Sequence, residues 1–250
     1  MKFLKKYALC FVLAIVLILG YEALVASGAL SQYMFVSFST VPETLAKNWD
    51  AEMDGLVSSL SMLGTAYILS VIAGVLLGSL IGLHKVVRHT ISPIITFLSV
   101  IPVTLITYYA LNLLPSFWAA SVFIIFLGCF WIILSSTIAA VHTIDKRYLE
   151  NSATLEVKGA ERFFRIVLPA ASPGILAGCS IALTLAFYML AVAETFGATS
   201  GLGYFVMTNS ELGNWDKTLA GLVFIAIVLG VIMLIFDLIK ARILHWTMNN

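Results

Sequence analysis

Charged residues are scarce in this 250-residue chain, and so are cysteines and histidines. Lys, Arg, Asp and Glu make up 11% of the sequence, against about 25% in an average soluble domain. Hydrophobic residues make up 61%, and the mean hydropathy is +1.03. A water-soluble fold of this size has too little interior to bury so much apolar surface, so lipid must solvate much of it. The composition therefore excludes a soluble enzyme, a disordered regulator and a secreted disulfide scaffold.

Patterns typical of metal, nucleotide or nucleic-acid binding are also missing. Cys10, Cys129 and Cys179 lie far apart within apolar runs, which favours small buried side chains over a metal site or a disulfide framework. The four histidines have no ligand-pair spacing, and no G-x-x-x-x-G-K-S/T phosphate loop is present. A net charge of +1 gives no electrostatic basis for nucleic-acid binding. We therefore expect no catalytic residue, metal or cofactor on this chain.

Long uncharged runs predict an all-α membrane protein, since about 20 apolar residues span a bilayer. The run 90–144 is too long for one span and carries a turn signal at 112–117, so it is divided into two spans. Pro42 predicts the start of a short surface helix at about 42–54. Six spans are expected in a single transmembrane domain covering 1–250, at about 7–27, 56–83, 91–112, 117–142, 170–193 and 218–239.

The positions of the basic residues predict the orientation of these spans. With both termini in the cytoplasm, only Lys47 and Lys217 of the 14 basic residues fall on the outer side. One alternative remains for the N-terminus, because Lys2, Lys5 and Lys6 before an apolar run are also typical of a secretory signal peptide. Cleavage of such a peptide would leave five spans.

Small and polar residues within the spans indicate packing faces and a candidate pathway. Gly74, Gly78 and Gly82 share one helix face by their four-residue spacing, which predicts close packing against another helix. Pro93 and Pro102 predict kinks in the third span, either as part of a substrate pathway or as simple bends.

Polar side chains in a span tend to face the helix bundle or a cavity. Glu194 lies at the outer end of the fifth span, where it forms either a gate contact or a contact with lipid headgroups. For the other polar residues the alternative to substrate contact is hydrogen bonding between helices. The candidate pathway residues are Thr104, Thr107, Tyr108 and Asn112 in the third span, and Thr184, Tyr188 and Glu194 in the fifth.

The inner loop 145–169 concentrates nine charged residues. Its pattern is compatible with two short helices, the second from Glu161 to Leu168, that form a docking surface for a soluble partner. An ordinary solvated loop that obeys the positive-inside rule is the competing interpretation.

At this loop the sequence resembles the EAA loop of bacterial ABC importer permeases. Glu150 and the Ile-x-Leu-Pro pattern ending at Pro169 match that loop at the right spacing. Asn151 and Ser152 replace the two usual alanines, and Glu156 replaces the usual glycine. Gly159, three residues later, is then expected to take over the turn between the two helices.

Two further stretches resemble the nitrate, sulfonate and taurine branch of these permeases. Residues 169–175 and 193–204 are similar to the branch sequences LPAALPGI and AEMLGASSGLGY. The likeness extends over roughly residues 40–240. The loop is specific for the superfamily, and the SGLGY stretch is more moderately specific for the branch.

The resemblance implies a type I ABC importer permease fold in the bacterial cytoplasmic (inner) membrane. It implies a homodimer, two cytoplasmic ATPase subunits that carry ATP and Mg²⁺, and an extracytoplasmic binding protein that delivers a sulfonate-, taurine- or nitrate-like solute. The chain itself would not be an enzyme. The residues that would dock the ATPase are Glu150, Ala153, Thr154, Gly159, Ala160 and Arg162.

A stand-alone, ion-coupled secondary transporter or channel is the alternative function. Such carriers usually hold ionisable groups in mid-membrane, whereas Glu22, Glu194 and Asp237 all lie near the ends of the predicted spans. A membrane scaffold without transport is a third possibility for which no sequence feature argues.

Overall fold

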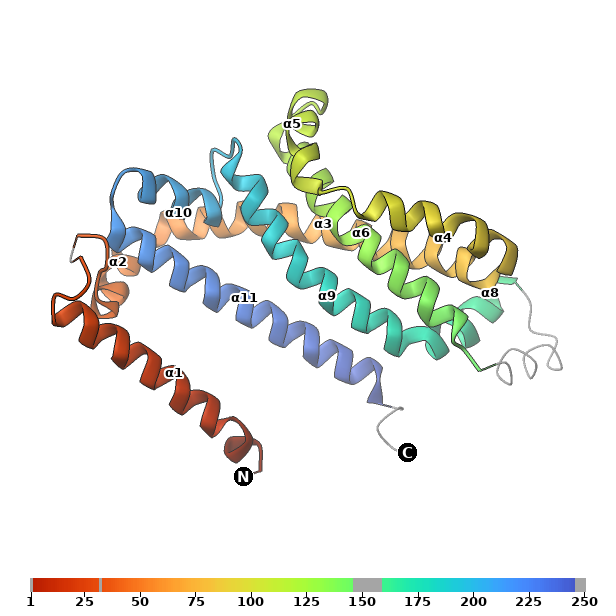
Figure 1. Ribbon diagram of the computed structural model, residues 1–250, viewed down its shortest axis with the longest axis horizontal. Helices are drawn as coiled ribbons and strands as arrows, with labels where there is room; N and C mark the ends of the chain where they lie inside the picture. Colours follow the sequence, from red (N-terminus) through yellow and green to blue (C-terminus); the bar gives the residue numbers. More distant parts are fainter. Residues whose placement is uncertain (1, 32, 146–158, 246–250) are drawn as a thin grey trace.

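The computed structural model describes residues 2–31, 33–145 and 159–245, and every regular element in these ranges is helical (Figure 1). The side chains of residues 2–11 and of Ala14 are not described. The elements are α1 (Lys2–Ala26), the 3₁₀ turn η1 (Phe38–Thr40), α2 (Val41–Lys47), α3 (Trp49–Leu83), α4 (Lys85–Ser99), α5 (Val103–Leu113), α6 (Phe117–His142), α8 (Gly159–Arg162), the π turn η2 (Phe163–Val167), α9 (Leu168–Thr195), α10 (Leu202–Glu211) and α11 (Trp215–Ile243).

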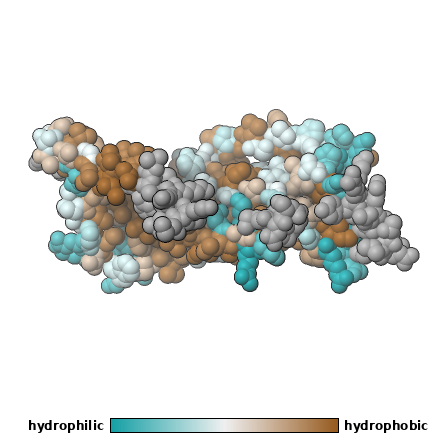
Figure 2. Space-filling view, turned by 90° about the horizontal axis from the view of Figure 1, so that it is seen from below, coloured by the Kyte–Doolittle hydropathy of each residue, from teal (hydrophilic) through white to brown (hydrophobic). Residues whose placement is uncertain are grey.

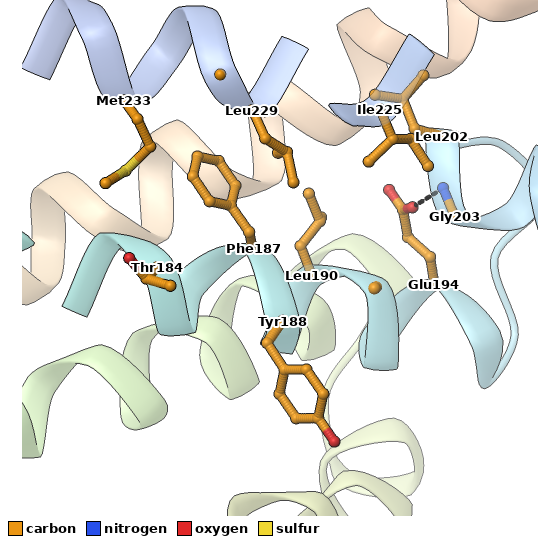
Figure 3. Close-up of a pocket in the computed structure, with 12 residues that line it drawn as sticks. Thr184, Phe187, Tyr188, Leu190, Glu194, Leu202, Gly203, Ile225, Leu229 and Met233 are labelled. Atoms are coloured by element: carbon orange, nitrogen blue, oxygen red, sulfur yellow. Dashed lines mark hydrogen bonds between the residues drawn. The ribbon is translucent and has the colours of Figure 1, made fainter. Parts of the chain in front are cut away.

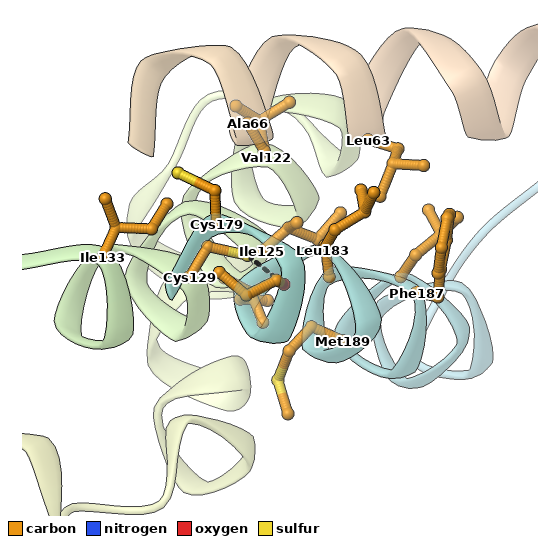
Figure 4. Close-up of a cluster of buried hydrophobic side chains, with 14 of the residues drawn as sticks. Leu63, Ala66, Val122, Ile125, Cys129, Ile133, Cys179, Leu183, Phe187 and Met189 are labelled. Atoms are coloured by element: carbon orange, nitrogen blue, oxygen red, sulfur yellow. Dashed lines mark hydrogen bonds between the residues drawn. The ribbon is translucent and has the colours of Figure 1, made fainter. Parts of the chain in front are cut away.

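Helix α6 forms the centre of the core and packs against α3 on one side and α9 on the other. Ile125, Cys129 and Ile133 on α6 are completely buried, and Cys179 of α9 lies in the same cluster (Figure 4). The Tyr67 hydroxyl of α3 donates a hydrogen bond of 2.7 Å to the carbonyl of Cys179. These contacts join three helices that are distant in sequence.

The glycine face of α3 lies directly against α6. Because these positions lack a Cβ, the two backbones approach more closely than ordinary side chains would allow. A Cβ built at Gly74, Gly78 and Gly82 would lie 2.8, 2.7 and 2.9 Å from side-chain atoms of Ile133, Thr137 and Val141, respectively. The same device recurs on α9, where Gly174 faces Ala140 of α6.

Four helical stretches of the described residues are long and apolar enough to cross a membrane. They are α3, α6, the stretch Gly159–Thr195 and α11, and the bent pair α4 and α5 would make a fifth span. Residues Ile15–Ala26 of α1 form a shorter apolar helix. The structure thus gives four or five candidate spans where the sequence predicts six. Hydrophobic residues cover much of the face shown in Figure 2.

The span predicted for 91–112 is not one continuous helix, because the structure divides this segment between α4 and α5, which are bent by 83° and together could form one broken span. The break falls at residues 100–102. Pro102 disfavours helical backbone in the preceding residue and lacks an N–H for the helix ladder. Pro93, in contrast, lies inside α4 without ending it.

The surface helix expected at 42–54 is also divided. Helix α2 ends at Lys47, and residues from Trp49 onward belong to the long helix α3. Pro42 lies in the first turn of α2, where its missing N–H costs nothing.

Helix α1 lies apart from the other long helices in Figure 1 and is anchored at its C-terminal end. The Glu22 carboxylate accepts hydrogen bonds from the Phe38 backbone N–H at 2.6 Å and from the Ser37 hydroxyl at 2.9 Å. The Tyr21 hydroxyl donates to the carbonyl of Val36 at 2.9 Å.

Candidate functional site

A buried carboxylate, Glu194, joins α9, α3 and the start of α10. Its side chain is 2% exposed. One carboxylate oxygen accepts a hydrogen bond of 2.6 Å from the backbone N–H of Gly203 (Figure 3). The other accepts from the Ser59 hydroxyl of α3. Ser59 in turn accepts a 2.9 Å hydrogen bond from the Leu202 N–H. The Glu194 side chain therefore satisfies N–H groups at the N-terminus of α10, directly at Gly203 and through Ser59 at Leu202.

The two glycines of the Gly201-Leu-Gly203 motif have a steric reason to be glycine. Gly201 has φ +143°, which L side chains rarely adopt, and a Cβ there would collide with the Glu194 carboxylate. A Cβ at Gly203 would lie 2.7 Å from the same carboxylate. Gly55 of α3 allows the α3 backbone to lie close to Gly201, since a Cβ added at Gly55 would lie 3.1 Å from the Gly201 backbone. The SGLGY stretch thus fits the start of α10 around one buried acid.

A cavity of about 530 Å³ extends from this carboxylate between α9 and α11. Its lining is mostly apolar, with Phe187, Leu190, Leu229 and Met233 along its length (Figure 3). Thr184, Tyr188 and Glu194 are the candidate pathway residues of the fifth span, and all three line this cavity. Figure 3 shows the Tyr188 side chain pointing away from α11.

The four candidate pathway residues of the third span lie on α5 and line none of the described cavities. Thr107 is completely buried, whereas Tyr108 and Asn112 are exposed. The Asn112 amide donates to the Tyr108 carbonyl at 2.7 Å within the helix. The Tyr108 ring makes an edge contact with Phe196, with ring centroids 5.3 Å apart. Thr104 is half-buried, and the structure does not bring these residues together with Thr184 and Glu194 around one cavity.

A second cavity, of about 460 Å³, lies at the break between α4 and α5. The break residues 100–102 and Val103, the first residue of α5, form one wall, and α6 contributes Trp131, Ser135 and Ser136. The sequence analysis did not select these α6 residues. The adjacent pair of serines in an uncharged run was the available signal, but the face on which they lie depends on how α6 packs.

The predicted docking residues are only partly described. Glu150, Ala153 and Thr154 lie outside the described residues. Gly159 begins α8 with φ +61°, a left-handed conformation that glycine adopts readily. Ala160 is exposed and Arg162 is half-buried.

The second short helix expected from Glu161 to Leu168 is not separate from the following span. Arg165 forms an ion pair of 2.8 Å with Glu161 across one helical turn. The chain continues from α8 through the π turn η2 directly into α9.

Comparison with known proteins agrees with the helical architecture. Residues 70–247 match the family described as binding-protein-dependent transport system inner membrane component. The nitrate import permease protein NrtB of Leptolyngbya laminosa is 25% identical over 173 residues, which cover 69% of this chain and 62% of that protein. The taurine transport system permease protein TauC of Escherichia coli is 29% identical over 196 residues, or 76% of this chain and 70% of that protein.

The fold is similar to that of a solved transporter subunit. A chain of the MetNI methionine ABC transporter, in an inward-facing conformation, superposes with a TM-score of 0.67 at 20% identity. The superposition covers 77% of this chain and 96% of that chain. The present chain spans less than two thirds of the length of the nitrate relative. On the match over residues 70–247, this multi-pass membrane protein belongs to the binding-protein-dependent transport system inner membrane component family.

Proposed function

We propose that this chain is the permease subunit of an ATP-driven importer for a small anion. The family match over residues 70–247 carries the proposal, because the family's members are components of binding-protein-dependent transport systems. Relatives are named as nitrate, taurine and bicarbonate permeases, and all three of these solutes carry an anionic group. A sulfonate, nitrate or similar oxyanion is therefore the proposed cargo.

The energy source is proposed to lie on other subunits. The sequence contains no phosphate-binding loop, so ATP and Mg²⁺ would bind to two cytoplasmic ATPase subunits. An extracytoplasmic binding protein would deliver the solute. Two copies of the chain would form the pathway, and rocking of the helices would expose it alternately to the two sides.

The segment 145–169 is proposed to connect the ATPase to the spans, with both chain termini in the cytoplasm. Its described part is continuous with α9 through α8 and η2, and force is transmitted better through packed helix than through a flexible loop. In this scheme Glu150, Ala153, Thr154, Gly159, Ala160 and Arg162 contact the ATPase. Glu194 stays a candidate pathway residue with Thr184 and Tyr188, since all three line the cavity between α9 and α11, and its carboxylate also holds the start of α10.

Gentle purification of the tagged full chain from its native host, followed by mass spectrometry, tests this function. We expect an ATPase subunit to accompany the chain. Reproducible purification as a lone protein, together with uptake driven by an ion gradient, would overturn the proposal in favour of a secondary transporter.

Substitution of Gly159 tests the coupling role. Gly159→Val should uncouple ATP hydrolysis from uptake by tenfold or more, because a β-branched residue is strained at φ +61°. Gly159→Asn is the matched control and should retain coupling, since asparagine tolerates this conformation. Equal uptake per ATP hydrolysed in both variants would contradict the coupling role.

A further inference from the structure

We propose that a cavity between α4 and α6 binds an oxyanion group, a phosphate or a sulfonate, through Arg88, His142 and the hydroxyl of Ser92. The cavity has a volume of about 160 Å³. It differs from the cavity beside Glu194 and from the one at the break between α4 and α5. Its lining comes from this chain alone, so the proposal does not depend on the importer function.

Two helix faces form the walls of this cavity. On α4, the residues Arg88, Ser92 and Thr96 follow one another at four-residue spacing and lie on one side of the helix. On α6, Ser135 and His142 lie seven residues apart, which is about two turns, and share one face. Polar side chains from two helices thus surround one small hollow.

An apolar contact between the same two helices holds the walls at a fixed spacing. The buried Ile95 of α4 packs in one cluster with Leu134 and Ile138 of α6. Ile95 and Ile138 also line the cavity. Because this contact sets the distance between α4 and α6, the polar side chains are held around the cavity by the fold itself.

Arg88 brings a positive charge that no acid in the described part of the chain balances. The residue is half-buried, and one guanidinium N–H donates a hydrogen bond of 2.8 Å to the Gly82 carbonyl. A guanidinium has five N–H donors, and no carboxylate among the described residues forms an ion pair with this one. A partly buried charge is costly unless a counter-charge or hydrogen bonds satisfy it. The bond to Gly82 therefore holds the guanidinium in place and leaves donors for an anion.

Further donors line the cavity beside this charge. The Thr96 hydroxyl donates to the Ser92 carbonyl at 3.0 Å, whereas the Ser92 hydroxyl has no hydrogen-bond partner among the described residues. The His142 imidazole can donate a hydrogen bond in either protonation state. None of the described residues that line the cavity is acidic. An anion would therefore meet charged and neutral donors together, while a cation would face Arg88.

The shape of the donors and the volume of the cavity define the class of ligand. A guanidinium donates two parallel N–H groups, which match the oxygens of a phosphate or a related oxyanion. The volume of about 160 Å³ is several times the roughly 30 Å³ of one water, so the cavity has room for a single oxyanion group. A free anion and a lipid headgroup present the same oxygens, and the two sources are separable by experiment.

Modification of histidines by diethyl pyrocarbonate, resolved by mass spectrometry, tests the site in the purified full chain. Dodecyl maltoside is a suitable detergent because it contains no phosphate. Inorganic phosphate should slow the modification of His142 about tenfold at ten times its midpoint concentration, as mass action requires. Potassium chloride at equal ionic strength should not. His84, His89 and His245 are exposed and line none of the described cavities, so they serve as internal controls.

A second arm identifies the source of the oxyanion. Phosphatidylglycerol, added to the same micelles, replaces inorganic phosphate. Protection of His142 by inorganic phosphate assigns the site to a free oxyanion, and protection by phosphatidylglycerol alone assigns it to a lipid headgroup. If neither protects His142 relative to the other three histidines, the proposal is overturned. Absence of an ATPase partner would refute the proposed function and leave this result unchanged.

Variants connect the protection to the proposed ligands. Arg88→Gln should raise the midpoint of protection about tenfold or more, as expected for lost hydrogen bonds from a charged group. Arg242→Gln removes an exposed positive charge in the last turn of α11 and should leave the midpoint within about twofold. Ser92→Ala keeps the bond between Arg88 and Gly82 and should raise the midpoint about fivefold. Equal midpoints in the unaltered chain and in both site variants would overturn the proposal.

Discussion

Glu194 is one carboxylate that holds three helices together at one end of the fold. Its carboxylate accepts hydrogen bonds from the Gly203 N–H and the Ser59 hydroxyl. The Ser59 oxygen in turn accepts a hydrogen bond from the Leu202 N–H. A hydrogen bond contributes about 0.5–1.5 kcal/mol to stability, and a buried donor or acceptor left without its partner costs about 1–3 kcal/mol. The stability of α10 therefore depends on glycines that leave room for this carboxylate.

Gly201→Ala should lower the free energy of unfolding by about 1–3 kcal/mol, because the added Cβ combines backbone strain with a clash against Glu194. Thermal unfolding in detergent measures the effect. Gly230→Ala is the matched control, since no atom lies within 4 Å of its Cβ position. Equal melting temperatures for the two variants would show that the contacts between Glu194 and the start of α10 do not stabilise the fold.

Helices α3 and α6 approach along the face that carries Gly74, Gly78 and Gly82. Close backbone approach replaces the hydrophobic effect as a source of attraction between helices in lipid, where packing and hydrogen bonds must drive association. The position of α6 between α3 and α9 therefore depends on residues without side chains.

Gly78→Ala should destabilise the chain by about 1–3 kcal/mol through overpacking, since its Cβ would lie 2.7 Å from Thr137 Cβ and 2.9 Å from the Leu134 carbonyl oxygen. Gly64→Ala on the same helix meets nothing within 4 Å and should be neutral or slightly stabilising. Melting temperatures of both variants in the same detergent decide the point. A drop for Gly64→Ala alone would contradict the assigned packing face.

Sequence patterns located some elements well and others poorly, for physical reasons. The span predicted at 117–142 coincides with α6. A long uncharged apolar run is enough to predict such a helix, because its length matches the thickness of a bilayer. The sequence did not reveal α10, since its ten residues are held by contacts with Ser59 and Glu194 rather than by their own periodicity. Pro102 indicated the break, but its 83° angle depends on packing.

The candidate sites show the same limit. The candidate residues of the fifth span line one cavity, because all three lie on α9; they are Thr184, Tyr188 and Glu194. Ser135 and Ser136 of α6 line the cavity at the break between α4 and α5. They escaped selection because the sequence does not mark which face of this mostly apolar helix borders a cavity. The roles of the docking and pathway residues stay predictions.

The described residues form a packed group of helices and a peripheral helix α1. Most described side chains of α1 are exposed, and its hydrogen bonds to the rest of the chain involve Tyr21 and Glu22 near its end. Lipid or another protein surface must therefore cover the apolar side chains of α1.

Removal of residues 2–26 should leave the remaining helices folded. We expect the midpoint of thermal unfolding to shift by no more than about 4 °C, which corresponds to roughly 1 kcal/mol in a chain of this size. Circular dichroism of the full and shortened chains in the same detergent provides the measurement. Loss of helical signal beyond that of the removed residues would show that α1 is part of the core.

The π turn at Phe163–Val167 has a consequence for building chimaeras from related permeases. A π turn accommodates one residue more than an α turn of similar rise, so the number of residues between Gly159 and Pro169 sets the rotational phase of the inner segment about α9. One residue added or removed would rotate that segment by about 100°. A segment grafted from a relative would therefore need the same number of residues between Gly159 and Pro169, and its length would matter more than its sequence.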